Sequence, residues 1–381
     1  MALYVHWPYC ARICPYCDFN VARDRGRTDE QAALAAAILA DLDRQAQRVG
    51  RRRLVSIFFG GGTPSLMAPG QVAAVIEGAR ARFDAAPDLE VSLEANPTDA
   101  EAGRFEALAA AGVNRLSLGV QSLDDAALKF LGRNHDAAAA RRAAEVARRA
   151  FPRLSIDLIY ALPGQSVATW RADLAEGLAL GPEHVSPYQL TIEAGTAFDR
   201  AVRRRVWAPP DEELGAALYE ATGEALESAG FEAYEVSNHA RGDAARSRHN
   251  LAYWRGADWL GVGPGAHGRI TDAEGRRWAT LAEPNIAAYV ARVTATGAGL
   301  ITDEALTRRE AALERLLMGL RTLEGVSLDD LAPLAIAPDA IEGLASNGLL
   351  ARGGGRLIAT PRGRAVLDRL TLELAQASAS D

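Results

Sequence analysis

The chain has 381 residues, a formal net charge of −7 and a pI near 5.6, with 49% hydrophobic and 24% charged residues. This is an ordinary composition for a soluble chain of about two domains. The net negative charge gives no electrostatic footprint for a nucleic acid. No apolar run reaches the roughly 18–20 residues that a membrane-spanning helix needs. We therefore expect a cytoplasmic protein with no nucleic-acid partner and no transmembrane segment, for which peripheral contact with a membrane stays open.

Short apolar runs rich in β-formers alternate with alanine-rich amphipathic segments, a pattern typical of βα units around a parallel sheet. The predicted strands are Leu3–Trp7, Val55–Phe59, Glu90–Glu94, Arg115–Val120, Leu154–Tyr160 and Val185–Leu190. The predicted helices are Asp29–Val49, Gln71–Phe83, Ala100–Ala111, Ala137–Ala150, Ala168–Leu180 and Asp211–Ala229. Polar and glycine residues follow several of these strands, at the edge where parallel barrels build their sites.

The pattern changes near Tyr234. Glycine- and aromatic-containing loops run to about Gly299, and a helix near Arg308–Arg321 follows. A further helix, a hairpin and a last helix predict a small α+β unit in winged-helix-like order, without a basic recognition face. We therefore divide the chain into domains 1–235 and 236–381, and expect the polar tail at Gln376–Asp381 to be disordered.

All three cysteines lie in one short stretch after the first strand, with the spacing C-x3-C-x2-C: Cys10, Cys14 and Cys17. They cannot form a disulfide framework, and free thiols fit the reducing cytoplasm. Three thiolates can hold three irons of a [4Fe–4S] cluster and leave the fourth iron open. A structural zinc site needs four ligands, and His6 could complete such a set. Pro8 and Pro15 favour a loop over a helix around these ligands.

This spacing after an N-terminal strand resembles the signature of the radical S-adenosylmethionine (SAM) superfamily. Along nearly its whole length the chain further resembles the coproporphyrinogen III oxidase-like (HemN/HemW) family of that superfamily. The stretches that carry the match are LYVHWPYC, FFGGGTPSL, LEANP, RLSLGVQS, LGRNH, SIDLIYALPGQ, YEVSNHA, HNLAYW and GVGPGAHG. The resemblance implies an α/β fold: a partial (β/α)6 barrel with a smaller C-terminal α+β domain. It also implies a [4Fe–4S] cluster, SAM, and a reducing electron donor.

The resemblance places the SAM site at the carboxyl ends of successive strands. Tyrosine rings would line the cluster and the adenine, and glycine-rich backbone would approach SAM closely. Glu94 would accept a hydrogen bond from SAM, and Arg133 would pair with the methionyl carboxylate. The full set of implied SAM residues is Tyr4, Tyr16, Gly61, Gly62, Thr63, Glu94, Gln121, Arg133 and Asp157.

Two stretches bear on the activity. Phe19 stands where the genuine oxidases carry a fourth cysteine, and a phenyl ring cannot ligate iron or do thiol chemistry. That difference matches the HemW branch, which is associated with haem binding and transfer. HNLAYW fits the HNxxYW motif of the same branch, and an imidazole can ligate haem iron while aromatic rings offer flat faces. The candidate haem residues are His249, Asn250, Tyr253 and Trp254.

We therefore expect a haem chaperone that binds a [4Fe–4S] cluster, SAM and haem and delivers haem to acceptor haemoproteins. The alternative is an oxygen-independent coproporphyrinogen III oxidase, which Phe19 puts in doubt. In that alternative the radical abstracts hydrogen from the propionate side chains, which lose CO2 and become vinyl groups. For the aromatic residues of HNLAYW, a purely structural role between domains also stays open. A zinc-containing binding module without SAM is a third possibility for the whole chain.

Overall fold

One large sheet organises the molecule. The computed structural model describes residues 1–378, and of residues 99 and 100 only the backbone. Within that range the sheet has 12 strands in the order β14-β13-β12-β11-β1-β4-β5-β6-β7-β8-β10-β9. The strands from β11 to β8 in this order run parallel to one another. They are β1 (Ala2–Trp7), β4 (Arg53–Gly61), β5 (Asp84–Ala95), β6 (Arg115–Gln121), β7 (Leu154–Tyr160), β8 (His184–Gln189) and β11 (Trp259–Val262).

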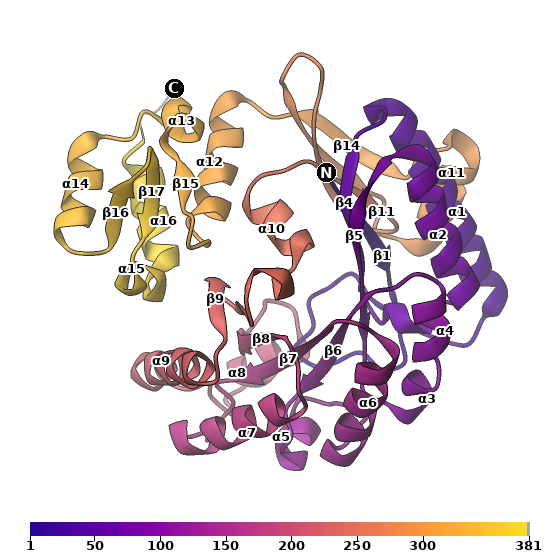
Figure 1. Ribbon diagram of the computed structural model, residues 1–381, viewed down its shortest axis with the longest axis horizontal. Coiled ribbons are helices and arrows are strands. Elements are labelled where there is room, and N and C mark those ends of the chain that lie inside the picture. Colours follow the sequence, from indigo (N-terminus) through magenta and orange to yellow (C-terminus); the bar gives the residue numbers. More distant parts are fainter. Residues whose placement is uncertain (379–381) are drawn as a thin grey trace.

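Antiparallel strands extend both edges of this parallel core. They are β9 (Glu232–Glu235), β10 (Asn238–Ala240), β12 (His267–Thr271), β13 (Arg277–Ala282) and β14 (Leu300–Ala305). The sheet curls into an open barrel with helices on its outer side (Figure 1). The main outer helices are α1 (Thr28–Val49), α2 (Pro69–Arg82), α3 (Asp99–Ala102), α4 (Phe105–Ala110), α6 (Ala137–Ala150), α7 (Val167–Ala179), α9 (Glu212–Ser228) and α11 (Ile286–Thr296).

The two faces of the barrel strands differ in chemistry because successive side chains of a strand point to opposite faces. On β5, Val91 and Leu93 are fully buried in the main hydrophobic cluster, which also holds outer-helix residues such as Leu34 and Ile38. Ser92 and Glu94 occupy the alternate positions and face the barrel interior. The interior therefore carries polar side chains, which suits a site and not a packed apolar core.

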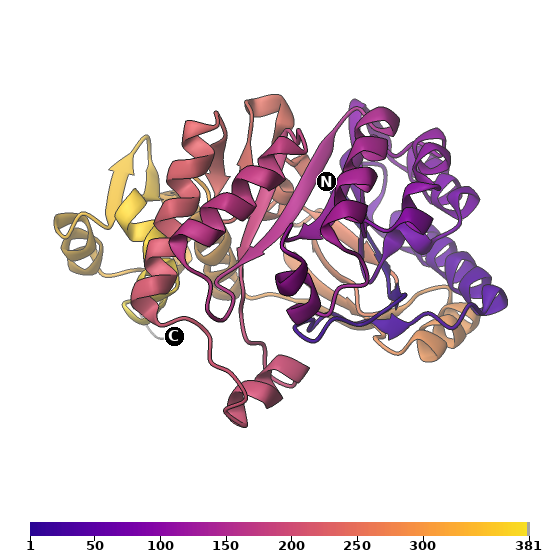
Figure 2. The ribbon, with the colours of Figure 1, turned by 90° about the horizontal axis from the view of Figure 1, so that it is seen from below.

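Two excursions from the barrel matter for the site. A loop with the short parallel pair β2 (Tyr9–Cys10) and β3 (Ala22–Arg23) connects β1 to α1. A second excursion follows β8 and carries α8 (Ala197–Arg203), which projects from the body of the molecule (Figure 2). The short helices η1 (Pro64–Leu66), α5 (Asp125–Phe130), η2 (Asp243–Ala245) and α10 (Arg248–Trp254) lie in other connections.

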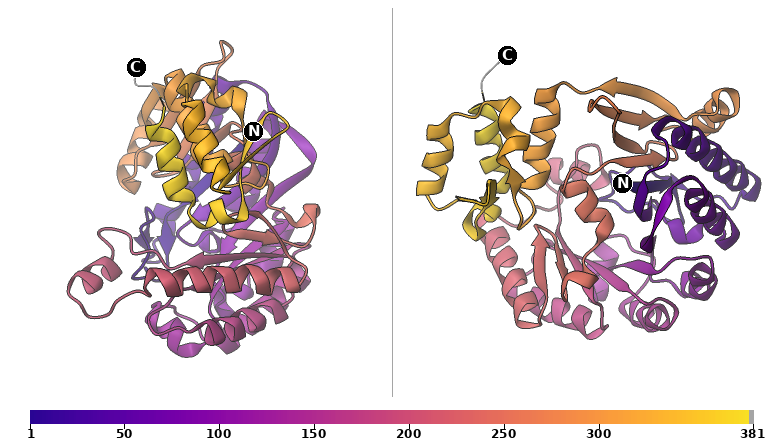
Figure 3. Two further views of the ribbon diagram at one scale, coloured as in Figure 1. Left: turned by 90° about the vertical axis from the view of Figure 1, so that its left-hand side faces the viewer. Right: turned by 45° about the horizontal axis from the view of Figure 1, so that its top comes forward.

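The C-terminal unit has a hydrophobic core of its own, with Leu316, Leu344 and Leu370 among its buried residues. Its sheet has the order β15-β17-β16, and the unit sits to one side of the barrel (Figure 3). Its elements are α12 (Arg308–Gly319), β15 (Val326–Ser327), α13 (Leu328–Leu331), η3 (Ala332–Leu334), α14 (Pro338–Ser346), β16 (Leu350–Gly353), β17 (Arg356–Ala359), α15 (Pro361–Ala365) and α16 (Leu367–Gln376). The predicted fold class, a partial barrel with a smaller α+β unit, is confirmed.

Some sequence predictions need correction. The predicted helix Ala100–Ala111 is two helices, because the chain turns at Gly103 and the Arg104 guanidinium donates to the carbonyls of Leu66 and Met67. The prediction had no strand for β11, which lies beside β1. Of the predicted disordered tail, residues 376–378 are described, and residues 379–381 lie outside the described residues.

The division at residue 235 runs between strands β9 and β10, which pair with each other in the same sheet. Residues such as Leu260, Ile270 and Tyr289 belong to the main hydrophobic cluster. We therefore propose a boundary near residue 306, where the sheet ends and α12 is about to begin. Within residues 1–378, no helix combines the length and apolar character needed to cross a membrane.

Candidate cluster, SAM and haem sites

The cysteine loop closes on itself through β2 and β3, so its three cysteines lie in a compact turn. Cys10 is buried on β2, whereas Cys14 and Cys17 are half-buried. The Cys17 amide donates to the Cys14 carbonyl at 3.2 Å. Burial raises the pKa of Cys10 to about 11, so this thiol keeps its proton until a metal replaces it.

His6 and Asn20 clamp the two ends of this loop together. His6 Nε2 lies 2.8 Å from the Asn20 carbonyl, which can only accept, so Nε2 carries the proton. Nδ1 then accepts from the Tyr4 hydroxyl at 3.0 Å. The Asn20 amide donates to the carbonyls of Pro264 and Pro284, both at 2.9 Å. Because both nitrogens of His6 are engaged, a fourth zinc ligand at His6 would have to break one of these hydrogen bonds.

Arg133 connects the cysteine loop to the strand ends. Its Nη1 lies 3.3 Å from both the Cys14 sulfur and the Tyr16 hydroxyl. Its Nη2 donates to the side-chain oxygen of Asn96 and, at 3.1 Å, to the Gly119 carbonyl. The predicted Tyr16 and Arg133 are therefore brought together at a cysteine ligand.

The glycine stretch at the end of β4 runs directly beside this loop. The Gly61 amide donates to Glu94 at 3.1 Å, and Gly61 has a φ of 113° that favours glycine. A Cβ on Gly62 would lie 2.6 Å from the Pro8 carbonyl oxygen. Thr63 hydrogen-bonds to Cys10 and accepts from the Asn96 amide at 3.0 Å. The backbone of the cysteine loop and the backbone of the glycine stretch therefore pack closely against each other at Gly62.

Two carboxyl groups share the barrel interior near these glycines. Burial, and then the nearby Asp157, raise the pKa of Glu94 to about 8. Burial also raises the pKa of Asp157 to about 6, although Ser117 donates to both of its oxygens at 3.3 and 3.2 Å. Near neutral pH, Glu94 therefore holds a proton for much of the time, and Asp157 is largely ionised.

Buried polar atoms without partners test whether a polar ligand fits here. Within residues 1–378, Gln121 Oε1 and Arg133 Nε are both buried and lack a hydrogen-bond partner. Gln121 also has a left-handed φ of 66°, a conformation uncommon outside glycine. Buried polar groups are normally paired. These two unpaired atoms, one of them on the Arg133 side chain that contacts the Cys14 sulfur, fit a polar cofactor at this site.

The four candidate haem residues lie on α10, at the amino ends of the strands. The His249 amide donates to Glu90 at 3.1 Å, and its Nδ1 lies 3.1 Å from the Ser56 hydroxyl. Glu90 and Glu94 are four residues apart on β5, which corresponds to about 13 Å along a strand. Glu90, which holds His249, is therefore about this far from the SAM candidate Glu94, whereas the ring of Tyr4, another SAM candidate, lies next to the His249 ring.

The His249 ring is packed among aromatic rings. Its centroid lies 4.9 Å from that of Phe58, 4.8 Å from that of Tyr253 and 6.4 Å from that of Tyr4. The residue is 4% exposed, and burial lowers the pKa of His249 to about 3. The imidazole is therefore neutral, as an iron ligand must be, and in this arrangement it is covered.

The other end of α10 contacts the C-terminal unit. The guanidinium of Arg321 lies over the Trp254 ring at 4.7 Å and 3.6 Å from Glu235. The Trp254 carbonyl accepts from Arg315 at 3.1 Å. Asn250 lies in the first turn, where its amide donates to the Ser247 hydroxyl at 3.2 Å. The helix thus bridges the barrel and the C-terminal unit (Figure 1).

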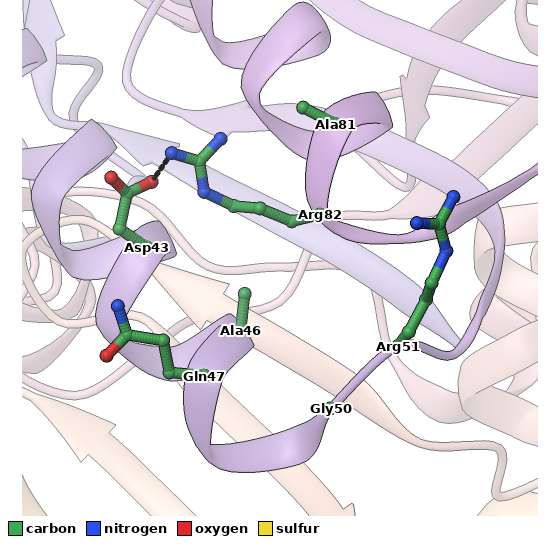
Figure 4. Close-up of a pocket in the computed structure, with 7 residues that line it drawn as sticks. All are labelled: Asp43, Ala46, Gln47, Gly50, Arg51, Ala81 and Arg82. Carbon is green, nitrogen blue, oxygen red and sulfur yellow. Dashed lines mark ion pairs between the residues drawn. The ribbon is translucent and has the colours of Figure 1, made fainter.

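Sequence reasoning missed several residues of this region. Asn20 ends the cysteine stretch CDFN, so motif position was the available signal. Glu90 and Ser56, which hold α10, gave no signal, because their role depends on a helix far away in the chain. A surface hollow between α1 and α2 lies outside the barrel and carries the ion pair between Asp43 and Arg82 (Figure 4).

Comparison with known proteins indicates the same superfamily as the sequence motifs do. Residues 4–176 match the model of the radical SAM superfamily, and residues 306–366 match the HemN C-terminal domain. The chain is 42% identical to radical S-adenosyl methionine domain-containing protein 1, mitochondrial, of Bos taurus, over 98% of this chain and 87% of that protein. It is 40% identical to "Heme chaperone HemW" of Escherichia coli, over 72% of each chain. The protein of that name in Mycobacterium tuberculosis is 37% identical, over 98% of this chain and 94% of that protein.

The solved structure of coproporphyrinogen III oxidase (HemN) from Escherichia coli superposes with a TM-score of 0.82, at 22% identity, over 98% of this chain and 89% of that chain. At this sequence identity, the likeness shows the fold alone. The relatives at 37–42% identity include proteins that carry the haem-chaperone name and proteins named for the radical SAM domain. The chain belongs to the radical SAM coproporphyrinogen III oxidase-like (HemN/HemW) family, within its HemW branch.

Proposed function

We propose that this chain is a cytoplasmic haem chaperone that holds a [4Fe–4S] cluster and SAM, binds haem, and delivers it to acceptor haemoproteins. The observation that carries the proposal is the 37–40% identity to proteins named "Heme chaperone HemW". The phenyl ring of Phe19 at the position of the oxidases' fourth cysteine supports it further.

In this proposal the three cysteines ligate the cluster and Arg133, beside Cys14, balances the negative charge of the thiolates. The cluster, when bound, supplies an open iron and one electron for the sulfonium of SAM. Gly61 and Gly62 would let SAM approach the backbone, and Gln121 and Arg133 would give their unpaired atoms to it. Tyr4 and Tyr16 would line the site, while Glu94 and Asp157 would offer a protonated and an ionised carboxyl.

Haem would contact α10 through His249, Tyr253 and Trp254. Because His249 is packed against Phe58, ligation of haem iron by this imidazole requires α10 to shift away from β4. The Ser56 hydroxyl on β4 engages His249 Nδ1 in the packed arrangement, so this shift would also break that hydrogen bond and free the ring for iron.

Haem titration of the reconstituted protein is expected to give a new Soret band that weakens in His249→Gly and returns when free imidazole is added. His267→Gly, on the exposed end of β12, is the matched control and should bind like the parent. Loss of the band in both variants, or no rescue, would count against His249 as ligand.

The oxidase alternative is tested in the same preparation. Conversion of coproporphyrinogen III to protoporphyrinogen IX with consumption of SAM, together with no haem binding, would overturn the chaperone proposal. A colourless protein that holds zinc and no iron after anaerobic reconstitution would overturn the cluster as well.

A further inference from the structure

Positive charge is concentrated in the cysteine loop and in the segment around α8. Residues 11–27 and 197–206 together hold eight arginines and three aspartates, in a chain whose net charge is −7. Arg27 pairs with Glu30 and Arg203 with Asp199. Five exposed arginines of these segments have neither an ion pair nor a side-chain hydrogen bond within residues 1–378, and we term them the arginine rim: Arg12, Arg23, Arg25, Arg204 and Arg205. Arg200 is also exposed, and it donates to the Gly195 carbonyl at 2.7 Å.

The two arginine-bearing segments lie side by side. The Phe198 amide of α8 donates to the Pro15 carbonyl of the cysteine loop at 3.0 Å. The Phe198 ring also lies 6.2 Å from Tyr16 and 4.8 Å from Phe130 of α5. Figure 2 shows α8 projecting on the same side as the N-terminal loop. The arginine rim therefore lies on two neighbouring segments of one face of the molecule, next to α5.

Exposed apolar side chains accompany these arginines. Phe19 is 61% exposed, Ile13 46% and Val206 71%. The Phe19 amide hydrogen-bonds to the Cys17 thiol, so an exposed residue at this face is in contact with a predicted iron ligand. A small apolar patch bordered by unpaired cations is suited to a transient encounter, in which charge steers the partner and little area is buried.

We propose that the arginine rim docks an acidic protein that donates single electrons to the cluster. The inference rests on the proposed function, because a SAM-cleaving cluster needs one electron from outside the chain. The donor's reduced flavin or iron–sulfur centre loses one electron and the cluster gains it, with no atom transferred. Docking at this face brings the donor to the loop that carries all three thiolates.

The chain offers an unusually clean test, because Lys129 on α5 is its only lysine. If the carboxylates of the flavodoxin alone are activated with carbodiimide and the excess reagent is quenched before mixing, they couple to amines of this chain and leave guanidinium groups unreacted. The other amine, at Met1, lies at the amino ends of the strands, where it donates to the Arg53 carbonyl at 2.8 Å. With an acidic flavodoxin as the probe, a one-to-one adduct at Lys129 is expected, and Lys129→Arg should abolish it without changing affinity.

Charge reversal measures the rim itself. Arg204→Glu with Arg205→Glu is expected to weaken flavodoxin binding about tenfold at low salt and to flatten its salt dependence. The control is Arg352→Glu with Arg362→Glu, two exposed arginines of the C-terminal unit, which should bind like the parent. Equal binding by both double variants, or an adduct that maps to Met1 alone, would overturn the proposal.

Reduction by dithionite separates this proposal from the proposed function. Dithionite reduces the cluster without a protein donor. If it does so normally, and the arginine-rim variants bind flavodoxin like the parent, the docking surface is wrong and the proposed function stands. If no iron is retained, the proposed function fails, and crosslinking still reports on docking. Binding of the parent to phosphatidylglycerol vesicles, lost in the reversal variant, with no flavodoxin binding, would overturn the donor in favour of a membrane surface.

Discussion

At the scale of single residues, Gly62 shows how close packing of the cysteine loop on β4 constrains the sequence. Its Cβ position is taken by the carbonyl oxygens of Pro8 and Tyr9, at 2.6 and 2.7 Å. Backbone cannot yield as a flexible side chain can, so any larger residue must push the cysteine loop away from β4. The three thiols and the glycine backbone would then separate.

We expect Gly62→Ala to destabilise the protein by about 1–3 kcal/mol, as overpacking does, and to reduce the iron retained after reconstitution. Gly70→Ala is the control, since a Cβ there meets nothing within 4 Å. Urea unfolding and iron analysis measure the two effects. Equal stability of both variants would show that the loop tolerates displacement.

The buried carboxyl of Glu94 makes a second prediction, concerning pH. Its pKa rises from 4.5 to about 8 on folding, so between these values the folded chain holds a proton that the unfolded chain has released. Glu94 therefore lowers the free energy of unfolding progressively as the pH rises through this interval. Glu94→Gln should gain stability relative to the parent at pH 8 and not at pH 4.5. Urea midpoints of the protein without SAM at both pH values measure this, with exposed Glu342→Gln as the control.

At the scale of elements, the barrel strands were predictable and the placement of α10 was not. Strands such as Leu154–Tyr160 follow from local apolar runs, and their inward polar residues from alternation. The cysteine triplet and the strand-end motifs are likewise visible in local sequence. The position of α10 against the sheet depends on Glu90, which is 159 residues from His249 in the sequence. Local sequence patterns carry no information about such contacts. The same holds for β11 and for the domain boundary.

The clamp on the cysteine loop is an element-scale device that can be tested. Asn20→Ala removes two hydrogen bonds, to Pro264 and Pro284, while the Asn20 carbonyl still accepts from His6. Since each such bond contributes about 0.5–1.5 kcal/mol, local opening should increase about tenfold, and trypsin should cleave faster after Arg12 and Arg23. The control is Asn347→Ala, which loses only a 2.9 Å hydrogen bond to the Gly343 carbonyl in the C-terminal unit. Trypsin should cleave the cysteine loop of this variant at the parent's rate.

At the scale of the whole molecule, Arg321 joins the two units. Its guanidinium lies between the Trp254 ring and the buried carboxylate of Glu235, and Arg255 pairs with Glu324 nearby. The C-terminal unit thereby holds the end of the helix that carries the haem candidates. Any shift of α10 on haem binding would have to strain or release this contact.

Arg321→Met keeps the apolar stem and removes the cation, which leaves Glu235 without its charged partner. We expect a loss of about 1–3 kcal/mol and a separate, earlier transition for the C-terminal unit in calorimetry. Arg369→Met, which loses an exposed pair with Glu373, should melt like the parent. A single unchanged transition in Arg321→Met would mean that other contacts dominate the interface.

The Asn20 clamp has a consequence for the order of events during synthesis. Its partners Pro264 and Pro284 follow it by 244 and 264 residues, and β1 is completed on one side only when β11 has been made. The cysteines therefore leave the ribosome long before the walls that fix their loop exist. Iron delivered early would meet three unrestrained thiols, so insertion of the proposed cluster would be a late step that waits for nearly the whole barrel.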